Sequence, residues 1–87
     1  MEQIEAKIKR ILIERLEVDP AVVESSDSAT PLLGQGIGLD SVEALQLAIG
    51  IELAFDLEVP DEDLTVDLFQ SIATLSRYVA NRLAARG

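Results

Sequence analysis

The stretch DSVEALQLAIGIELAF, residues 40–55, contains a helix-start signal followed by apolar residues at helical spacing. Asp40 is placed to cap this helix, and Glu43 completes a capping box in which each side chain accepts a hydrogen bond from the other residue's backbone amide. One apolar face is formed by Ala44, Leu47, Ala48, Ile51 and Phe55. We therefore predict a helix over Ser41–Phe55 that packs on a core through this face.

The same helix carries a second apolar face, roughly opposite the first. It consists of Val42, Leu45, Ile49 and Leu53, and it is interrupted by Gln46 and Glu52. A domain of this size can bury one face fully, and an unpaired carboxylate such as that of Glu52 is rarely buried. We expect the second face to be partly exposed or to cover a cavity.

Helical patterns flank this stretch on both sides. A first helix is predicted over Glu2–Leu16, with Ile4, Ile8, Ile11 and Leu12 at core spacing and with Asp19-Pro20 as its stop. The region from Val18 to Leu39 is rich in Ser, Asp, Thr, Pro and Gly, and it predicts a long loop that Leu32 and Leu33 pin to the core.

After Pro60, Asp61-Glu62-Asp63-Leu64 predicts the first turn of a short helix. Ser71 is the expected cap of a last helix, which carries Ile72, Leu75, Val79 and Leu83 at core spacing and the cations Arg77, Arg82 and Arg86 toward its end. The predicted fold is all-α: a small antiparallel bundle of three longer helices plus one short helix, with a long loop between the first two. Its 87 residues indicate a single domain, residues 1–87.

The composition excludes most catalytic classes. The chain has no Cys and no His, which removes disulfides, thiolate zinc sites, a cysteine nucleophile and the commonest general base. The bases left to activate a serine are Lys7 and Lys9, on the first helix. The acidic run Asp61-Glu62-Asp63 lacks the spacing and the glycine of a calcium loop. We predict no catalytic residue and no metal site.

Charge is distributed unevenly along the chain. The net charge is −9; all seven Lys and Arg residues lie at 7–15 and 77–86, and thirteen carboxylates lie between them. This field repels nucleic acid and anionic membranes and favours a basic protein partner. The chain also has no apolar run near the roughly 18 residues that span a bilayer, and no signal-peptide core at its start. We expect a cytoplasmic monomer that binds neither nucleic acid nor membrane.

The segment Gly38-Leu39-Asp40-Ser41-Val42-Glu43 places a serine at the start of a helix, directly after a glycine-bearing loop. It resembles the acyl carrier protein family, the phosphopantetheine-binding carrier domains, whose hallmark is an Asp-Ser-Leu-type motif opening the second helix. Asp40-Ser41-Val42 matches this motif, with Val where Leu is commoner, and Phe55 falls fourteen residues after Ser41, as in the family. The resemblance continues through Phe55–Glu62, Ser71–Val79 and Ile4–Leu16, so it covers nearly the whole chain.

The resemblance implies that Ser41, next to Asp40, receives 4′-phosphopantetheine from coenzyme A through a phosphopantetheinyl transferase. The arm would carry acyl groups as thioesters to acyl-transferring and acyl-processing enzymes of fatty-acid or lipid biosynthesis, which would dock through basic patches. The residues expected to contact them are Val42, Glu43, Leu45, Gln46, Ile49, Glu52, Leu53 and Asp56.

Alternatives to this function remain open at the level of sequence. Family members in general fatty acid synthesis usually carry carboxylates at the positions of Gln46, Leu53 and Ala54, so we expect a specialised rather than a general carrier. A carrier of polyketide or aminoacyl intermediates is a second possibility. A different class of function is an unmodified acidic helical domain that binds a partner helix through the second face of Ser41–Phe55.

Overall fold

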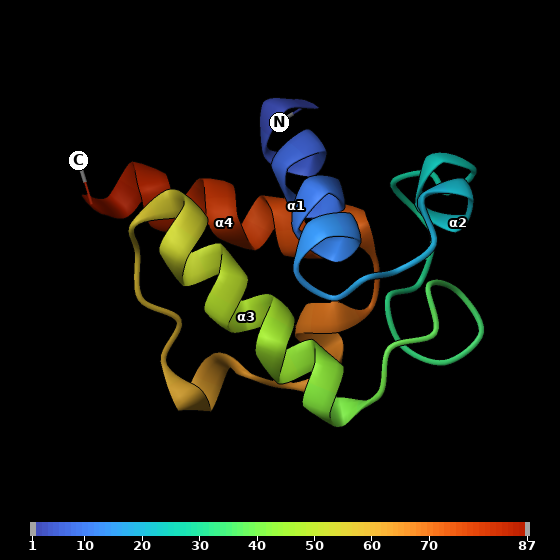
Figure 1. Cartoon of the computed structure of the whole chain (residues 1–87). Coiled ribbons are helices and arrows are strands. Elements are labelled where there is room, and N and C mark those ends of the chain that lie inside the picture. The colour runs from blue at the N-terminus through green and yellow to red at the C-terminus, as the bar shows by residue number, and fades with distance from the viewer. Residues whose placement is uncertain (1, 87) are drawn as a thin grey trace.

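The computed structural model describes residues 2–86 and shows an all-helical fold, as predicted. In this range it contains four α-helices, α1 (Glu2–Glu14), α2 (Pro20–Glu24), α3 (Ser41–Phe55) and α4 (Ile72–Arg86), and two 3₁₀ helices, η1 (Asp61–Asp63) and η2 (Val66–Phe69) (Figure 1). The described residues form no β-strand, only an isolated bridge between Leu33 and Leu39. The side chain of Arg86, expected near the end of the last helix, lies outside the described part.

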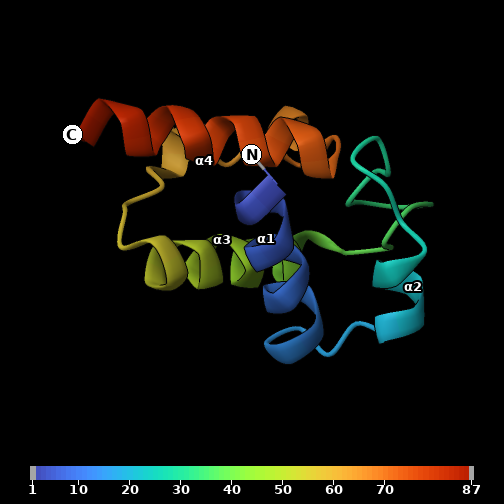
Figure 2. The same cartoon turned by 90° about the horizontal axis from the view of Figure 1, so that it is seen from above.

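The helices pack around α1, which contacts both α3 and α4. Figures 1 and 2 show that α1 crosses the other two long helices steeply, whereas α3 and α4 run in the same general direction. The expected antiparallel arrangement therefore does not extend to the pair α3 and α4. The physical reason is the connection over residues 56–71, which is long enough to return the chain to the end where α3 begins.

Three predicted boundaries differ from the structure. The first helix ends at Glu14 rather than Leu16, because the chain turns at Glu17, whose φ of 59° is left-handed. Asp19-Pro20 does not stop this helix but starts α2: Asp19 caps it, and Pro20 occupies its first turn, where no amide hydrogen is needed. The helix expected at Asp61–Leu64 is the single 3₁₀ turn η1.

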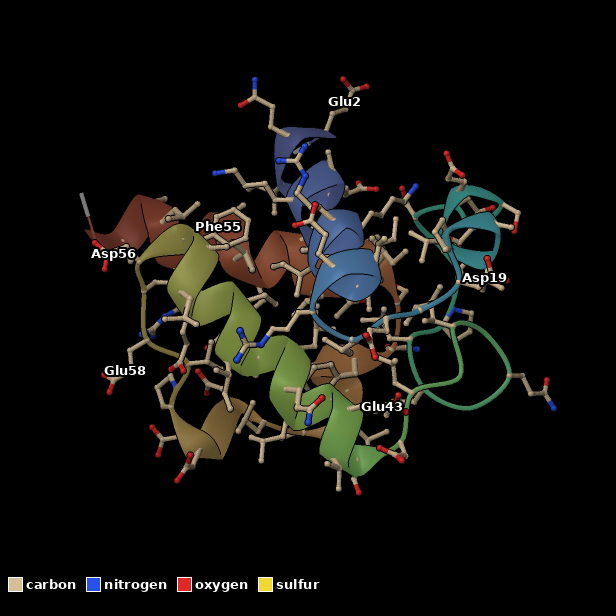
Figure 3. The ribbon with its side chains drawn as sticks, viewed as in Figure 1. Glu2, Asp19, Glu43, Phe55, Asp56 and Glu58 are labelled. Atoms are coloured by element: carbon tan, nitrogen blue, oxygen red, sulfur yellow. The ribbon has the colours of Figure 1, made fainter. Side chains whose placement is uncertain are left out.

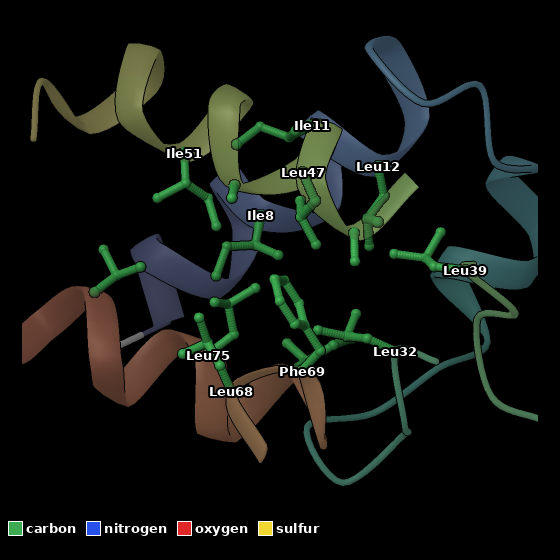
Figure 4. Packing of buried hydrophobic residues seen from close by; sticks show 14 of the residues in the cluster. Ile8, Ile11, Leu12, Leu32, Leu39, Leu47, Ile51, Leu68, Phe69 and Leu75 are labelled. Carbon is green, nitrogen blue, oxygen red and sulfur yellow. The ribbon is translucent and has the colours of Figure 1, made fainter. Parts of the chain in front are cut away.

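The core consists mainly of aliphatic side chains from every long helix, from the first loop and from the connection, and it also includes the ring of Phe69 (Figure 4). The predicted inner face of α3 is buried at Ala44, Leu47, Ala48 and Ile51, while Phe55 is half-buried. At Gly50, α1 and α3 approach so closely that an added Cβ would lie 2.7 Å from Cγ2 of Ile11. This crossing fixes the position of α1 on one side of α3.

The loop before α3 is a tight, packed structure. Leu32 is fully buried, which confirms that it pins the loop, and its carbonyl accepts a hydrogen bond from the Leu39 amide at 3.0 Å. Gly36 lies against Pro31: a Cβ at residue 36 would be 1.9 Å from the Pro31 carbonyl oxygen, so only glycine fits there. The loop therefore delivers residues 39–41 to a fixed place at the start of α3.

Candidate functional site

The start of α3 leaves the hydroxyl of Ser41 without a structural role. The Glu43 amide donates to Oδ1 of Asp40 at 2.8 Å, and the Asp40 amide donates to Oε1 of Glu43 at 3.1 Å, which is the predicted capping box. Ser41 is exposed, and within residues 2–86 neither its hydroxyl nor its backbone amide forms a hydrogen bond. The helix is thus capped by Asp40, and the serine oxygen is accessible to a reagent from solvent.

A pocket of about 400 Å³ opens beside Ser41. Apart from Ser41 and Thr65 its lining is apolar, and it consists of Leu33, Leu39, Ala44, Leu45, Leu64, Val66 and Phe69. The volume is in the range of pockets that hold small molecules. The start of α3 therefore combines an accessible hydroxyl with an apolar pocket.

The far wall of this pocket is the connection between α3 and α4, and three side chains tie the connection to the helices. Glu52 of α3 accepts a hydrogen bond from the Val59 amide at 2.8 Å, and Arg82 of α4 donates to the Glu58 carbonyl at 3.0 Å. The hydroxyl of Tyr78 in α4 donates to Asp63 of η1. Burial, together with this hydrogen bond and the negative charge of Asp63, raises the pKa of Tyr78 from 10.0 to about 12, so the phenol stays protonated near neutral pH.

The second apolar face of α3 lies at the surface. Val42, Leu45, Ile49 and Leu53 are 63%, 49%, 38% and 69% exposed, which confirms the expected exposure. Leu45 also lines the pocket, so this face meets the pocket at its mouth. We call these four residues the α3 stripe.

The residues predicted to bind partners are spread along the whole of α3. Figure 3 shows Glu43 near its start and Asp56 at its opposite end, where Asp56 is the exposed C-cap. Gln46 is exposed midway along the helix. Ser41 and Leu45 line the pocket, and Asp40 directly precedes Ser41 in the chain. Leu53 and Asp56 lie roughly 20 Å along the helix from Ser41, at about 1.5 Å per residue.

Two of the predicted docking carboxylates already hold backbone amides. Glu43 closes the capping box, and Glu52 anchors Val59; both are only half-exposed. This leaves the surface of α3 more apolar than its sequence alone indicated.

Sequence reasoning missed the far side of the pocket. Leu33, Leu39, Leu64, Val66 and Phe69 come from segments far apart in the chain, and only the folded loop and connection bring them together. A local signal was nevertheless present, because Leu64 and Val66 are apolar residues in an otherwise polar stretch.

Comparison with known proteins shows the family of the chain. Residues 6–79 match the family described as "Phosphopantetheine attachment site". Over 79 residues, covering 91% of this chain and 94% of the relative, the chain is 40% identical to a protein of Bdellovibrio bacteriovorus named "Acyl carrier protein". The chain belongs to the acyl carrier protein family.

The prosthetic group of this chain is therefore covalently attached 4′-phosphopantetheine, and the start of α3 fits it. The group requires a hydroxyl for a phosphodiester, and its phosphate is favoured by amides without acceptors, such as that of Ser41, at the positive end of a helix. The carboxylate of Asp40 would oppose a phosphate attached at this helix start, so the helix end would provide only part of its stabilisation. The thiol that carries the cargo comes from the group, not from this cysteine-free chain.

The family defines further general properties of the chain. Acyl carrier proteins are carriers rather than catalysts, and a carrier domain interacts with a phosphopantetheinyl transferase and with acyl-processing enzymes. Among the described residues, no group of three or more His, Cys, Asp and Glu side chains is arranged to hold a metal ion. None of the helices over residues 2–86 has the length and apolar character needed to cross a membrane.

Proposed function

We propose that Ser41 is the attachment residue and that the chain carries acyl groups as thioesters on the arm bound there. The observation that carries this proposal is the exposed Ser41 hydroxyl at the mouth of an apolar pocket, on a helix that Asp40 already caps. In the loading step the serine oxygen would form a bond to the phosphorus atom of coenzyme A that bears the pantetheine. The bond from this phosphorus to the other half of the pyrophosphate would break, and adenosine 3′,5′-bisphosphate would leave. A base on the transferase would take the serine proton, since no described side chain of residues 2–85 is hydrogen-bonded to Ser41.

The pocket supports acyl groups as the cargo. Each methylene moved from water into an apolar site contributes about 0.8 kcal/mol, so even a short chain gains from entering this pocket. Polyketide or aminoacyl cargo is the alternative within the family, and its more polar groups would gain less from such a lining.

We further propose that the chain is a single carrier domain, acting as a cytoplasmic monomer in fatty-acid or lipid biosynthesis and without catalytic activity of its own. Its pathway would be specialised, because Gln46, Leu53 and Ala54 present no negative charge at the exposed surface of α3. An enzyme that docks by charge alone would find few free carboxylates there.

Loading of Ser41 is tested by mass spectrometry. The purified chain is incubated with coenzyme A and a promiscuous phosphopantetheinyl transferase, and the modified residue is mapped by peptide analysis. We expect a single addition at Ser41, none for Ser41→Ala, and normal loading of Ser71→Ala, a control at the serine that caps α4. Loading of Ser41→Ala would overturn the site assignment. If the wild-type chain is not modified, the result would favour the alternative function, an acidic helical domain that binds a partner helix without a prosthetic group.

Specialisation is tested by adding charge to α3. In the acylated protein, Gln46→Glu and Leu53→Glu should raise kcat/KM with a general ketosynthase or acyltransferase, and the gain should shrink with added salt. A wild-type chain that already works as well as a general carrier would contradict the specialised role.

A further inference from the structure

The α3 stripe lies between two surfaces of opposite charge. On one side, α1 places Lys7, Arg10 and Arg15 around a groove that reaches Leu53 and Ala54 of α3. Glu14 is the carboxylate in this groove, so cations predominate there. We call these three basic residues the cationic edge.

The cationic edge is held in place by the crossing of α1 over α3. Arg15 lies over Gly50, with its Cδ 3.0 Å from the place a Cβ would take, and the Nζ of Lys7 is 5.2 Å from the centre of the Phe55 ring. Arg10 is the most available member: its side chain is 75% exposed, and its Nε is 3.6 Å from Glu14, in a pair that is also exposed. Such exposed pairs exchange readily with a partner's charges.

The other side of the stripe is acidic. Leu45 shares its pocket with residues 64–66 of the connection, and the same connection exposes the carboxylates of Glu58, Asp61 and Glu62. Figure 3 shows Glu58 projecting from the connection, away from α1. An apolar strip therefore separates a cationic edge on α1 from an anionic edge on the connection.

We propose that the phosphopantetheinyl transferase docks across the α3 stripe with a matching two-sided charge pattern, presenting carboxylates to Lys7, Arg10 and Arg15 and cations to the connection. The proposal rests on the proposed function, because the transferase must bring its active site to Ser41. A standard interface covers about 800 Å² per partner, so an enzyme centred near Ser41 also covers the stripe, which is about 17 Å long. Opposite charges on the two sides would fix the orientation in which it binds.

This arrangement predicts the sign of a charge change. If the partner surface were uniformly basic, as the net charge of −9 suggests, replacing a cation of α1 by a carboxylate would speed association. If the partner presents carboxylates to α1, the same replacement slows it. The two docking modes therefore predict opposite changes in the association rate for the same charge replacement on α1.

The experiment compares Arg10→Glu with Arg77→Glu, an exposed α4 cation that shares a groove with Glu62, so that the two added carboxylates fall on opposite sides of the proposed charge pattern. Both variants change the net charge equally. Rates of loading are measured with coenzyme A and the transferase that loads the wild-type chain, at low salt and at about 0.5 M salt, where screening is nearly complete. We expect Arg10→Glu to lose about three- to tenfold in kcat/KM relative to Arg77→Glu at low salt, with the difference vanishing at high salt. Arg10→Gln should lose less, in the same direction.

The apolar contact is tested by a second matched pair. Ile49 is 38% exposed in the stripe, and Val22 is 41% exposed on α2, outside it. Ile49→Ser should slow loading severalfold, without rescue by salt, whereas Val22→Ser should not. Equal rates in either pair, or a faster Arg10→Glu, would overturn the proposed docking mode. Loading of Ser41 in the wild type would still stand in that case, so the two proposals fail separately.

Discussion

Replacing Glu52 by alanine should destabilise the fold, because this carboxylate anchors the connection that walls the pocket. Its Oε2 accepts the hydrogen bond of the Val59 amide at 2.8 Å, and Val59 is only 7% exposed. A hydrogen bond to a charged group contributes about 1.5–3 kcal/mol, and a buried amide left without an acceptor costs about 1–3 kcal/mol. Since Glu52 is half-exposed and water can replace part of the bond, we expect a loss of about 1.5 kcal/mol.

The assay is urea unfolding followed by circular dichroism at neutral pH. Glu58→Ala is the matched control, because it removes an exposed carboxylate from the same connection and leaves the Glu58 carbonyl bonded to Arg82. Its effect should stay within about 0.5 kcal/mol. Glu52→Gln keeps an acceptor in the same place and should recover most of the lost stability.

Equal stability of Glu52→Ala and Glu58→Ala would refute the structural role of Glu52. Glu52 would then remain a candidate for direct contact with partner enzymes. If Glu52→Gln is as stable as the wild type and is loaded at the same rate, the charge of Glu52 has no part in docking.

Three other properties of the chain can be checked by simple unfolding measurements. Ser76 is fully buried in α4 and its hydroxyl has no partner among residues 2–86, so Ser76→Ala should raise the free energy of unfolding by about 1 kcal/mol; a loss of stability would contradict this. The excess of carboxylates should make Tm rise between dilute buffer and about 0.2 M salt, and a flat or falling Tm would argue against internal repulsion. The pKa of Tyr78, raised to about 12, favours the protonated phenol in the fold, so its stabilisation is complete below pH 10 and is lost as pH rises toward 12. Tyr78→Phe should lack this fall in the pH dependence of unfolding; an unchanged fall would assign it to other groups.

Local signals predicted the elements that depend on neighbouring residues. The bounds of α3, its capping box and its two faces followed from caps and periodicity within fifteen residues. The end of α1 did not, because a left-handed turn at Glu17 has no strong sequence signal when the residue is not Gly or Asn. Asp19-Pro20 was ambiguous, since the same pair can end one helix or begin the next.

In the candidate site, too, some features depend on neighbouring residues and others depend on the fold. The position of Ser41 at the start of α3 could be predicted, because the capping signal and the apolar periodicity lie in one short segment. The pocket wall and the cationic edge could not, since they depend on where the connection and α1 pass α3 in space. The capping box predicted the backbone amide that Glu43 binds, but the amide of Val59 that Glu52 binds depends on the path of the connection and could not be predicted.

The two faces of α3 also divide the helix into positions that can change at different rates. Substitutions at Leu47 or Ile51 alter the core and would be removed by selection for folding, whereas Gln46 and Leu53 can change with little effect on it. A duplicated copy of such a gene could therefore encode a protein that binds new partner enzymes through substitutions on the outer face of α3 alone. A designer could use the same freedom to graft the surface of one carrier onto the interior of another.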